Sequence, residues 1–163
     1  MTRPLIAVGV DGSPVSIAAL RWAVEEAAAT GREVRAIAAW SYAPALEPGG
    51  VVMPADEMAA AHRRTLEEVI RRATGEHPTV PVVPALVEED PVEALLEAAK
   101  YASLLVLGSH GRGRLKTALL GSVSARCLRR ATCPVVIIPA GAIRDGAALA
   151  PLAATGQVPG PPL

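Results

Sequence analysis

Hydrophobic positions along the chain form short runs that alternate with segments of helical periodicity. The runs contain few polar side chains, which is typical of strands buried on both faces of a parallel sheet. They predict strands at residues 5–10, 34–40, 80–87, 104–107 and 135–138. In the segments between them, apolar residues recur every three or four positions, which predicts helices beginning near residues 14, 56, 91 and 122.

Prolines mark both helix starts and a weak strand. Ser13-Pro14 and Asp90-Pro91 each place a capping side chain before a proline, and proline suits the first helical turn because it lacks an N–H. Pro81 interrupts the third strand, as does Pro84, which predicts a strand at the edge of the sheet. The strict alternation predicts an α/β, Rossmann-like fold: a five-stranded parallel sheet with helices on both faces.

The chain has the length of one domain, and its end differs in composition from the rest. We expect residues 1–140 of the 163 to form the α/β domain. Residues 141–163 are rich in Ala, Gly and Pro and have no hydrophobic periodicity, which predicts a flexible tail. An arm that docks on a partner is the alternative.

Composition narrows the classes of partner. Hydrophobic residues make up 51% of the chain, so a core can form, but only 2% are aromatic, which disfavours base-stacking platforms. The formal net charge is zero, so we expect no nucleic-acid binding. The absence of a signal peptide and of a membrane span predicts a cytoplasmic protein without a membrane partner. Basic residues without acids occupy 98–143, which hints at an anionic ligand.

A glycine-rich segment after the fourth strand carries the features of a phosphate site. Glycines allow close backbone approach, successive N–H groups can cradle an anion, and a helix start adds its dipole. Gly108 and Gly113 have the glycine spacing of a Walker A loop, but Arg114-Leu115 replaces its Lys and Ser/Thr, and no dinucleotide fingerprint follows the first strand. The candidate residues are Gly108, Ser109, His110, Gly111, Arg112, Gly113 and Arg114, followed by Gly121, Ser122, Val123 and Ser124.

The spacing Gly108-x2-Gly111-x9-Gly121-Ser122 resembles the universal stress protein family, and in particular its ATP-binding branch. Three further segments resemble that family in the right order, so the similarity covers about residues 4–140: Val8 to Ser13, Asp90-Pro91, and Cys133 to Pro139. Glu89 departs from it, because the family often has glycine there. The resemblance implies the strand order 3-2-1-4-5, which places the ends of strands one and four side by side.

The resemblance also implies roles for individual residues. Gly108, Gly111, Arg112 and Gly113 would line the phosphates and ribose, and the segment from Gly121 to Ser124 would close over the phosphates. Gly9 and Asp11 would face the nucleotide from the first strand. Asp11 would lie near the ribose or a magnesium ion bound to ATP, the one metal expected. Ala38 would belong to the adenine slot, and Val87 would also contact adenine.

The implied function is that of an ATP-binding regulatory protein in the stress response. No residue is evident that would orient a water for attack, so we expect slow or no hydrolysis, at most a weak ATPase, and no catalytic residue. The alternative is a nucleotide-free interaction module with the same fold, and a more distant one is an α/β domain serving an enzyme. Partners beyond ATP would include a second copy of the chain, paired through Val135, Val136, Ile137 and Ile138.

Several of these residues also have structural explanations. Asp11 can act simply as a cap of the first helix, and His110 can be an exposed loop residue whose backbone alone matters. Ser122 is predicted as the N-cap of the last helix, a role compatible with a phosphate contact. The two cysteines, Cys127 and Cys133, are predicted to be small core residues.

Overall fold

The strands and helices alternate along the chain in the predicted order. The computed structural model describes residues 4–42, 52–75, 77, 79–110 and 120–142. The strands in these ranges are β1 (Leu5–Gly9), β2 (Glu33–Trp40), β3 (Val82–Glu88), β4 (Leu104–Gly108) and β5 (Val135–Ile138). The helices between them are α1 (Pro14–Thr30), α2 (Ala55–Ala73), α3 (Pro91–Ala99) and α4 (Ser122–Arg130).

The sheet has the predicted order β3-β2-β1-β4-β5, and every neighbouring pair is parallel. β1 lies in the middle, with Val8 level with Ala36 of β2 and with Val106 of β4. The chain leaves β1 toward β2 on one side and reaches β4 on the other, so the carboxyl ends of β1 and β4 form the switch point of the sheet. β3 is an edge strand, as its prolines predict.

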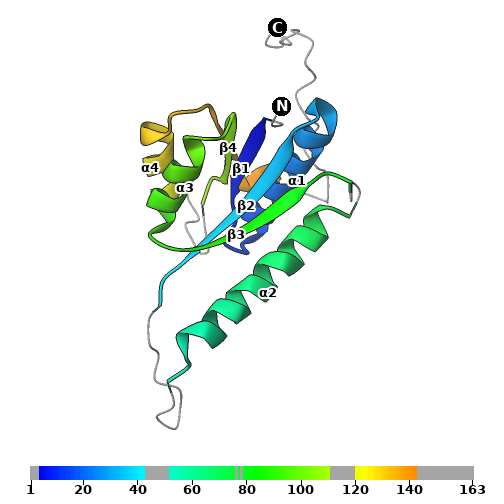
Figure 1. Cartoon of the computed structure of the whole chain (residues 1–163). Coiled ribbons are helices and arrows are strands. Elements are labelled where there is room, and N and C mark those ends of the chain that lie inside the picture. The colour runs from blue at the N-terminus through cyan, green and yellow to red at the C-terminus, as the bar shows by residue number, and fades with distance from the viewer. Residues whose placement is uncertain (1–3, 43–51, 76, 78, 111–119, 143–163) are drawn as a thin grey trace, which may run out of the picture.

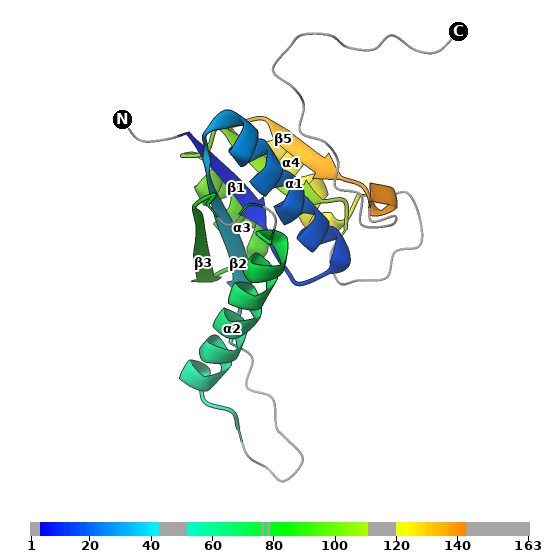
Figure 2. The same ribbon diagram turned by 90° about the vertical axis from the view of Figure 1, so that its right-hand side faces the viewer.

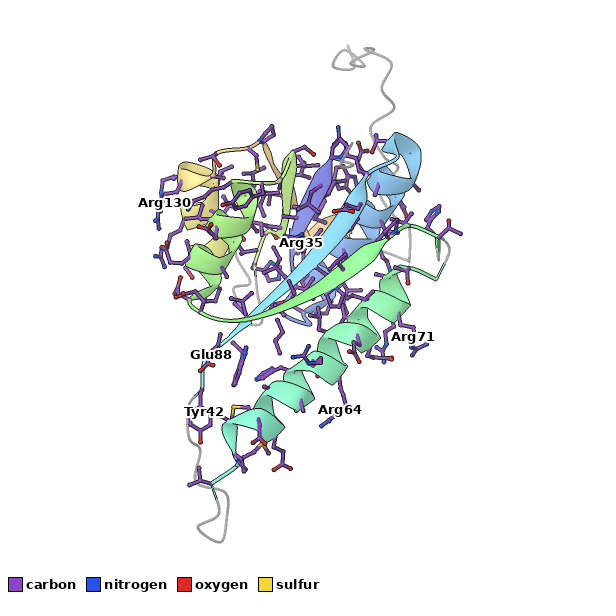
Figure 3. The ribbon with its side chains drawn as sticks, in the orientation of Figure 1. Arg35, Tyr42, Arg64, Arg71, Glu88 and Arg130 are labelled. Atoms are coloured by element: carbon purple, nitrogen blue, oxygen red, sulfur yellow. The ribbon has the colours of Figure 1, made fainter. Side chains whose placement is uncertain are left out.

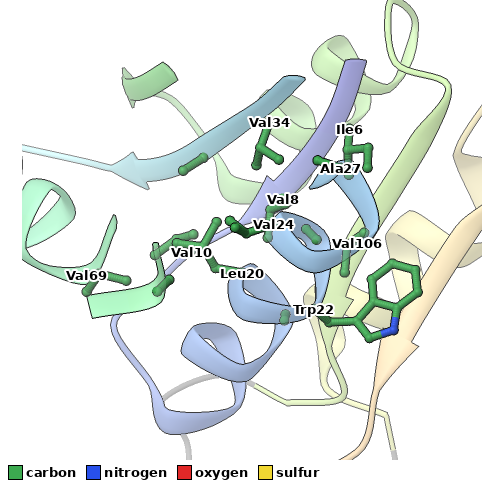
Figure 4. Packing of buried hydrophobic residues seen from close by; sticks show 14 of the residues in the cluster. Ile6, Val8, Val10, Leu20, Trp22, Val24, Ala27, Val34, Val69 and Val106 are labelled. Carbon is green, nitrogen blue, oxygen red and sulfur yellow. The ribbon is translucent and has the colours of Figure 1, made fainter. Parts of the chain in front are cut away.

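Helices cover both faces of the sheet (Figures 1 and 2), and an apolar layer lies between the helices and each face. One layer packs α1 and α2 against the first face and contains Val8, Leu20 and Val106, drawn in Figure 4. The other packs α3 and α4 against the second face and contains Ala7 and Leu105. Because successive strand residues point to opposite faces, an uninterrupted apolar strand supplies both layers at once.

The cysteines belong to the second layer. Cys127 is fully buried there and Cys133 packs against it, as predicted for small core residues. Burial raises the pKa of the Cys127 thiol, and it raises the pKa of the Cys133 thiol for the same reason. Both groups therefore stay protonated and behave as small apolar side chains near neutral pH.

Local hydrogen bonds confirm two predicted helix starts and correct a third. Ser13 Oγ accepts from Ser16 N at 3.3 Å, and Asp90 Oδ1 accepts from Val92 N at 2.9 Å. The N-cap of α4 is Gly121, and not Ser122 as predicted. The carbonyl of Gly121 accepts the first helical bond, from Ala125 N at 2.9 Å, so Ser122 is already the first helical residue.

Two further predictions concern the ends of the chain and its relation to membranes. Most of the predicted tail, residues 143–163, lies outside the described residues. The last residues before it pack on the domain: Ala142 N donates to Pro139 O at 3.0 Å, and Ala142 contacts the first apolar layer. None of the helices in the described ranges has both the length and the hydropathy needed to span a membrane.

Gly108, at the end of β4, is required by packing. A Cβ at this position would come within 2.8 Å of Val15 Cγ1 and 3.3 Å of the Val15 backbone carbon. Val15 is buried in the first turn of α1, and its β-branched side chain has little rotamer freedom in a helix. The first turn of α1 can therefore lie directly on the end of β4 only because residue 108 has no side chain.

We predict that Gly108→Ala lowers the free energy of unfolding by about 1–3 kcal/mol through overpacking against Val15. Urea denaturation measures this. Gly75→Ala is the matched control, because its Cβ would meet nothing closer than Arg72 O at 4.0 Å. The control should change the free energy of unfolding by less than about 0.5 kcal/mol. If the two substitutions lower the free energy of unfolding equally, the Val15 side chain can move away from the added methyl group without loss of stability.

Candidate functional site

A pocket of about 340 Å³ opens at the switch point, at the carboxyl ends of β1 and β4. The first residues of α3 and α4 complete its walls. It gathers eight of the candidate site residues, and the full lining is Gly9, Val10, Asp11, Ser16, Ile37, Ala39, Pro91, Leu95, Leu107, Gly108, His110, Gly121, Ser122, Val123 and Ser124. Its size falls at the lower end of the range for small-molecule sites, about 300–1,000 Å³. We call it the main pocket.

Asp11 both shapes the turn after β1 and lines the pocket. Its Oδ1 accepts from Ser13 N at 2.9 Å, and its backbone N–H donates to Ser16 Oγ at 3.3 Å. Gly12, with φ of 78°, allows the chain to turn between them. The Asp11 side chain is nevertheless exposed at the pocket. Asp11 thus fixes the turn before α1, whose N-cap is Ser13, and its carboxylate lies beside the cavity.

The start of α4 forms the opposite wall. Gly121 N donates to Ser109 O at 2.7 Å, and Ser124 Oγ donates to Gly108 O at 2.6 Å. Ser109 N in turn donates to Ile138 O at 2.8 Å. No side chain in the described ranges caps α4, and its first residues line the pocket. The amides and the positive dipole end of α4 are therefore available to an anion there.

His110 lies at this same end of the pocket. Its side chain is half-buried, and its Nδ1 lies 3.1 Å from Ser109 Oγ, within hydrogen-bonding distance. Ser109 itself does not line the pocket. His110 therefore lines the pocket, and its imidazole lies beside Ser109.

The other end of the pocket is apolar, and its residues were not predicted from the sequence. Ile37 and Ala39 of β2, with Pro91 and Leu95 of α3, form this apolar part of the wall, which we call the apolar slot. Strand alternation turns Ala38 to the opposite face, where it lines a second pocket of about 200 Å³. From Ala36 to Ala39 the strand is apolar on both faces, so this part of the sequence does not show which of Ala38 and Ala39 faces the main pocket.

The remaining candidates lie elsewhere. Val87 lines neither pocket, although it is paired with Ala39 across the sheet and shares its face. Four candidate residues fall outside the described residues: Gly111, Arg112, Gly113 and Arg114. Within the described ranges, no group of three His, Cys, Asp or Glu side chains is placed to hold a metal ion.

Two arginines of α4 are directed to α3 instead of the pocket. Arg130 Nη1 lies 2.8 Å from Glu93 Oε1, and Arg126 Nη2 lies 4.0 Å from the same oxygen. Figure 3 shows Arg130 on the outer side of these helices. The pairs are half-exposed, so they contribute little to the free energy of unfolding. The positive charges of both arginines lie next to the negative charge of Glu93.

Comparison with known sequences identifies the family of the chain. The sequence model of the universal stress protein family matches residues 4–139. A universal stress protein of Mycobacterium tuberculosis is 39% identical over 132 residues, which are 81% of this chain and 44% of that protein. The chain thus spans less than half the length of this curated relative.

Solved structures show the same fold. The chain is similar to a universal stress protein crystallised in complex with cAMP, with a TM-score of 0.63 and 29% identity. That alignment covers 85% of this chain and 98% of the other. It is also similar to a universal stress protein family member from Burkholderia pseudomallei, with a TM-score of 0.61, 33% identity, and coverage of 85% and 97%.

We predict that Ser124→Ala lowers the free energy of unfolding by about 1–2 kcal/mol, because it removes the hydroxyl donor from the Gly108 carbonyl. Chemical denaturation measures this loss. Ser122→Ala is the matched control, since Ser122 is exposed and caps nothing. It should cost less than about 0.5 kcal/mol. If Ser124→Ala costs no more than the control, the bond does not fix α4 on β4.

Proposed function

Because the chain belongs to the universal stress protein family, we propose that it is an ATP-binding regulatory protein of the stress response. One observation carries this proposal: the main pocket joins an apolar slot to the uncapped start of α4. A nucleotide has the same polarity, with a flat base at one end and phosphates at the other. The cAMP complex of a similar protein, 29% identical, supports a nucleotide as the ligand.

The residues of the pocket fit the parts of ATP. The adenine would enter between Ala39 and Leu95, and the phosphates would accept hydrogen bonds from the first amides of α4. Asp11 would lie beside the ribose or contribute one carboxylate to a phosphate-bound magnesium ion. The candidates Gly111 to Arg114 would add further donors to the phosphates. The bound nucleotide would supply a switchable charge and shape to the surface of the domain.

The same geometry favours slow or absent hydrolysis. Hydrolysis needs an oriented water as well as stabilised phosphate charge. Among the described residues that line the pocket, Asp11 is the one carboxylate, and Ser13 N already donates to it. Binding would therefore regulate a conformation or a partner in the cytoplasm, where we place the protein. The alternative, a nucleotide-free interaction module, does not explain why a pocket of this size remains at the switch point.

Calorimetric titration of the full chain with Mg-ATP tests the proposal. We predict that Ser122→Asp weakens ATP binding by about tenfold or more, because it places a negative charge beside the phosphates. Adenosine should bind the variant and the wild type equally, since it lacks phosphates. The folded state should not suffer, because an acidic residue in the first turn suits a helix start.

Thr132→Asp adds the same charge at an exposed position beyond α4, outside the main pocket, and serves as the matched control. It should leave the Kd for ATP unchanged. If the wild type does not bind ATP, the proposal is wrong and the nucleotide-free interaction module takes its place. If the wild type binds ATP and Ser122→Asp does not weaken this binding, the phosphates do not lie beside the start of α4.

We also propose a homodimer that pairs β5 with its copy. β5 lies at one edge of the sheet, and its sequence from Val135 to Ile138 is entirely β-branched. An exposed edge of this kind is prone to strand pairing, which a symmetric dimer would satisfy. Light scattering on the full chain at micromolar concentration should give twice the chain mass of 16.8 kDa. A monomer mass across that range would contradict the pairing.

A further inference from the structure

The second pocket adjoins the main pocket on the other side of the strand ends. It lies in the angle between α2 and the carboxyl ends of β1, β2 and β3, and Figures 1 and 2 show α2 continuing past those ends. Its lining is Val10, Asp11, Gly12, Ala38, Ala39, His62, Thr65, Leu66, Val69 and Leu86. Three of these residues, Val10, Asp11 and Ala39, also line the main pocket. We call this second pocket the annex.

The annex is small and lined mostly by uncharged residues. Gly12, Ala38 and Ala39 leave the space, and apolar side chains such as Leu66 and Leu86 surround it. Its volume, about 200 Å³, is below that of a typical small-molecule site and suits a substituent better than a whole ligand. Asp11 and His62 are the only ionisable groups among its described lining residues, so it offers no second phosphate site.

An aromatic pair borders the annex. His62 of α2 lines it, and the His62 ring lies against Trp40 at the end of β2, with centroids 5.5 Å apart and planes tilted by 38°. Aromatic faces and edges favour contact with another flat ring over contact with an aliphatic chain. This pair also provides a spectroscopic reporter, because Trp40 is one of only two tryptophans in the chain.

The residues shared by the two pockets indicate which part of a ligand would reach the annex. Ala39 belongs to the apolar slot, while the start of α4 forms the opposite end of the main pocket. Asp11 and Val10 lie at the junction, beside the middle of a ligand that spans those ends. For a nucleotide, the middle is the sugar, whose hydroxyl groups suit the Asp11 carboxylate.

We propose that the annex binds a flat, uncharged ring attached to the sugar of a nucleotide held in the main pocket. The ligands that this protein prefers would then be ring-substituted nucleotides, and plain ATP would fill only part of the site. This inference rests on the proposed function, since it takes the main pocket to hold a nucleotide. It also gives a role to Ala38, which lines the annex and not the main pocket.

The probe is ATP carrying an N-methylanthraniloyl ring on a ribose hydroxyl, compared with ATP by calorimetry on the full chain. The substituted nucleotide should bind about tenfold more tightly, because its ring leaves water for an apolar pocket. Ala38→Leu fills the annex and should remove this advantage while leaving the Kd for ATP unchanged. Ala28→Leu, on the exposed side of α1, is the matched control and should preserve the advantage.

Thr65→Phe provides a second variant that does not alter the sheet. Thr65 is an exposed residue of α2 that lines the annex, so a phenylalanine there blocks the annex without burying new volume in the core. It should also remove the advantage of the ring-bearing nucleotide. Failure of Ala38→Leu to fold therefore leaves the proposal testable.

Fluorescence locates the ring independently. Excited tryptophan transfers energy to the anthraniloyl group, and Trp40 adjoins the annex, whereas Trp22 lies in the core between α1 and the sheet. Trp40→Phe should remove most of the transfer, and Trp22→Phe should retain it. Transfer that depends on Trp22 alone would overturn the placement.

Equal affinities for ATP and the ring-bearing nucleotide, unchanged by Ala38→Leu and Thr65→Phe, would overturn the annex while leaving ATP binding in place. A different result would contradict the proposed function: plain ATP would not bind the wild type at all. If the ring-bearing nucleotide also failed to bind, both proposals would be wrong.

Discussion

The structure depends on β1 being buried on both faces at the centre of a parallel sheet. β2 and β4 lie on either side of it, so the chain leaves β1 toward one neighbour and returns on the other. The helices α1 and α3 consequently cover opposite faces, and the described residues leave a cavity where the strands end. The main pocket exists because of this divergence, and its floor is the pair of strand ends at Gly9 and Gly108.

Backbone contacts then determine what the pocket can bind. A Cβ on Gly9 would lie 2.8 Å from Leu107 Cδ2, and one on Gly108 would lie 2.8 Å from Val15 Cγ1. The absence of side chains at these two glycines therefore allows close packing, and it also leaves room in the pocket above the strand ends. The bonds from Gly121 N to Ser109 O and from Ser124 Oγ to Gly108 O hold α4 against that floor. The start of α4 is thus fixed to the sheet, so its first amides are held in place beside the pocket.

The sequence predicted most of the fold because buried parallel strands and their helix caps leave strong local signals. Apolar runs located every strand, and Ser13 and Asp90 marked two helix starts correctly. The strand order came from the family resemblance, since spacing alone does not determine it. Tertiary geometry decided what local signals could not: Gly121 is the N-cap that was assigned to Ser122, and Ala39 lines the main pocket whereas Ala38 lines the second pocket. The annex was not predicted, because it depends on the angle between α2 and the strand ends.

The basic segment after residue 98 shows why an anion site has to be judged from the structure. Three of its charges pair with acids of α3: Lys100 with Glu97, and Arg126 and Arg130 with Glu93. These acids immediately precede the basic segment in sequence. Glu97 pairs locally at the end of α3, and Glu93 pairs once α3 and α4 pack together, so the apparent excess of positive charge is partly neutralised. Exposed pairs of this kind contribute little to stability. Within the described residues, attraction for an anion therefore depends on the amides at the start of α4, which no substitution of a surface arginine removes.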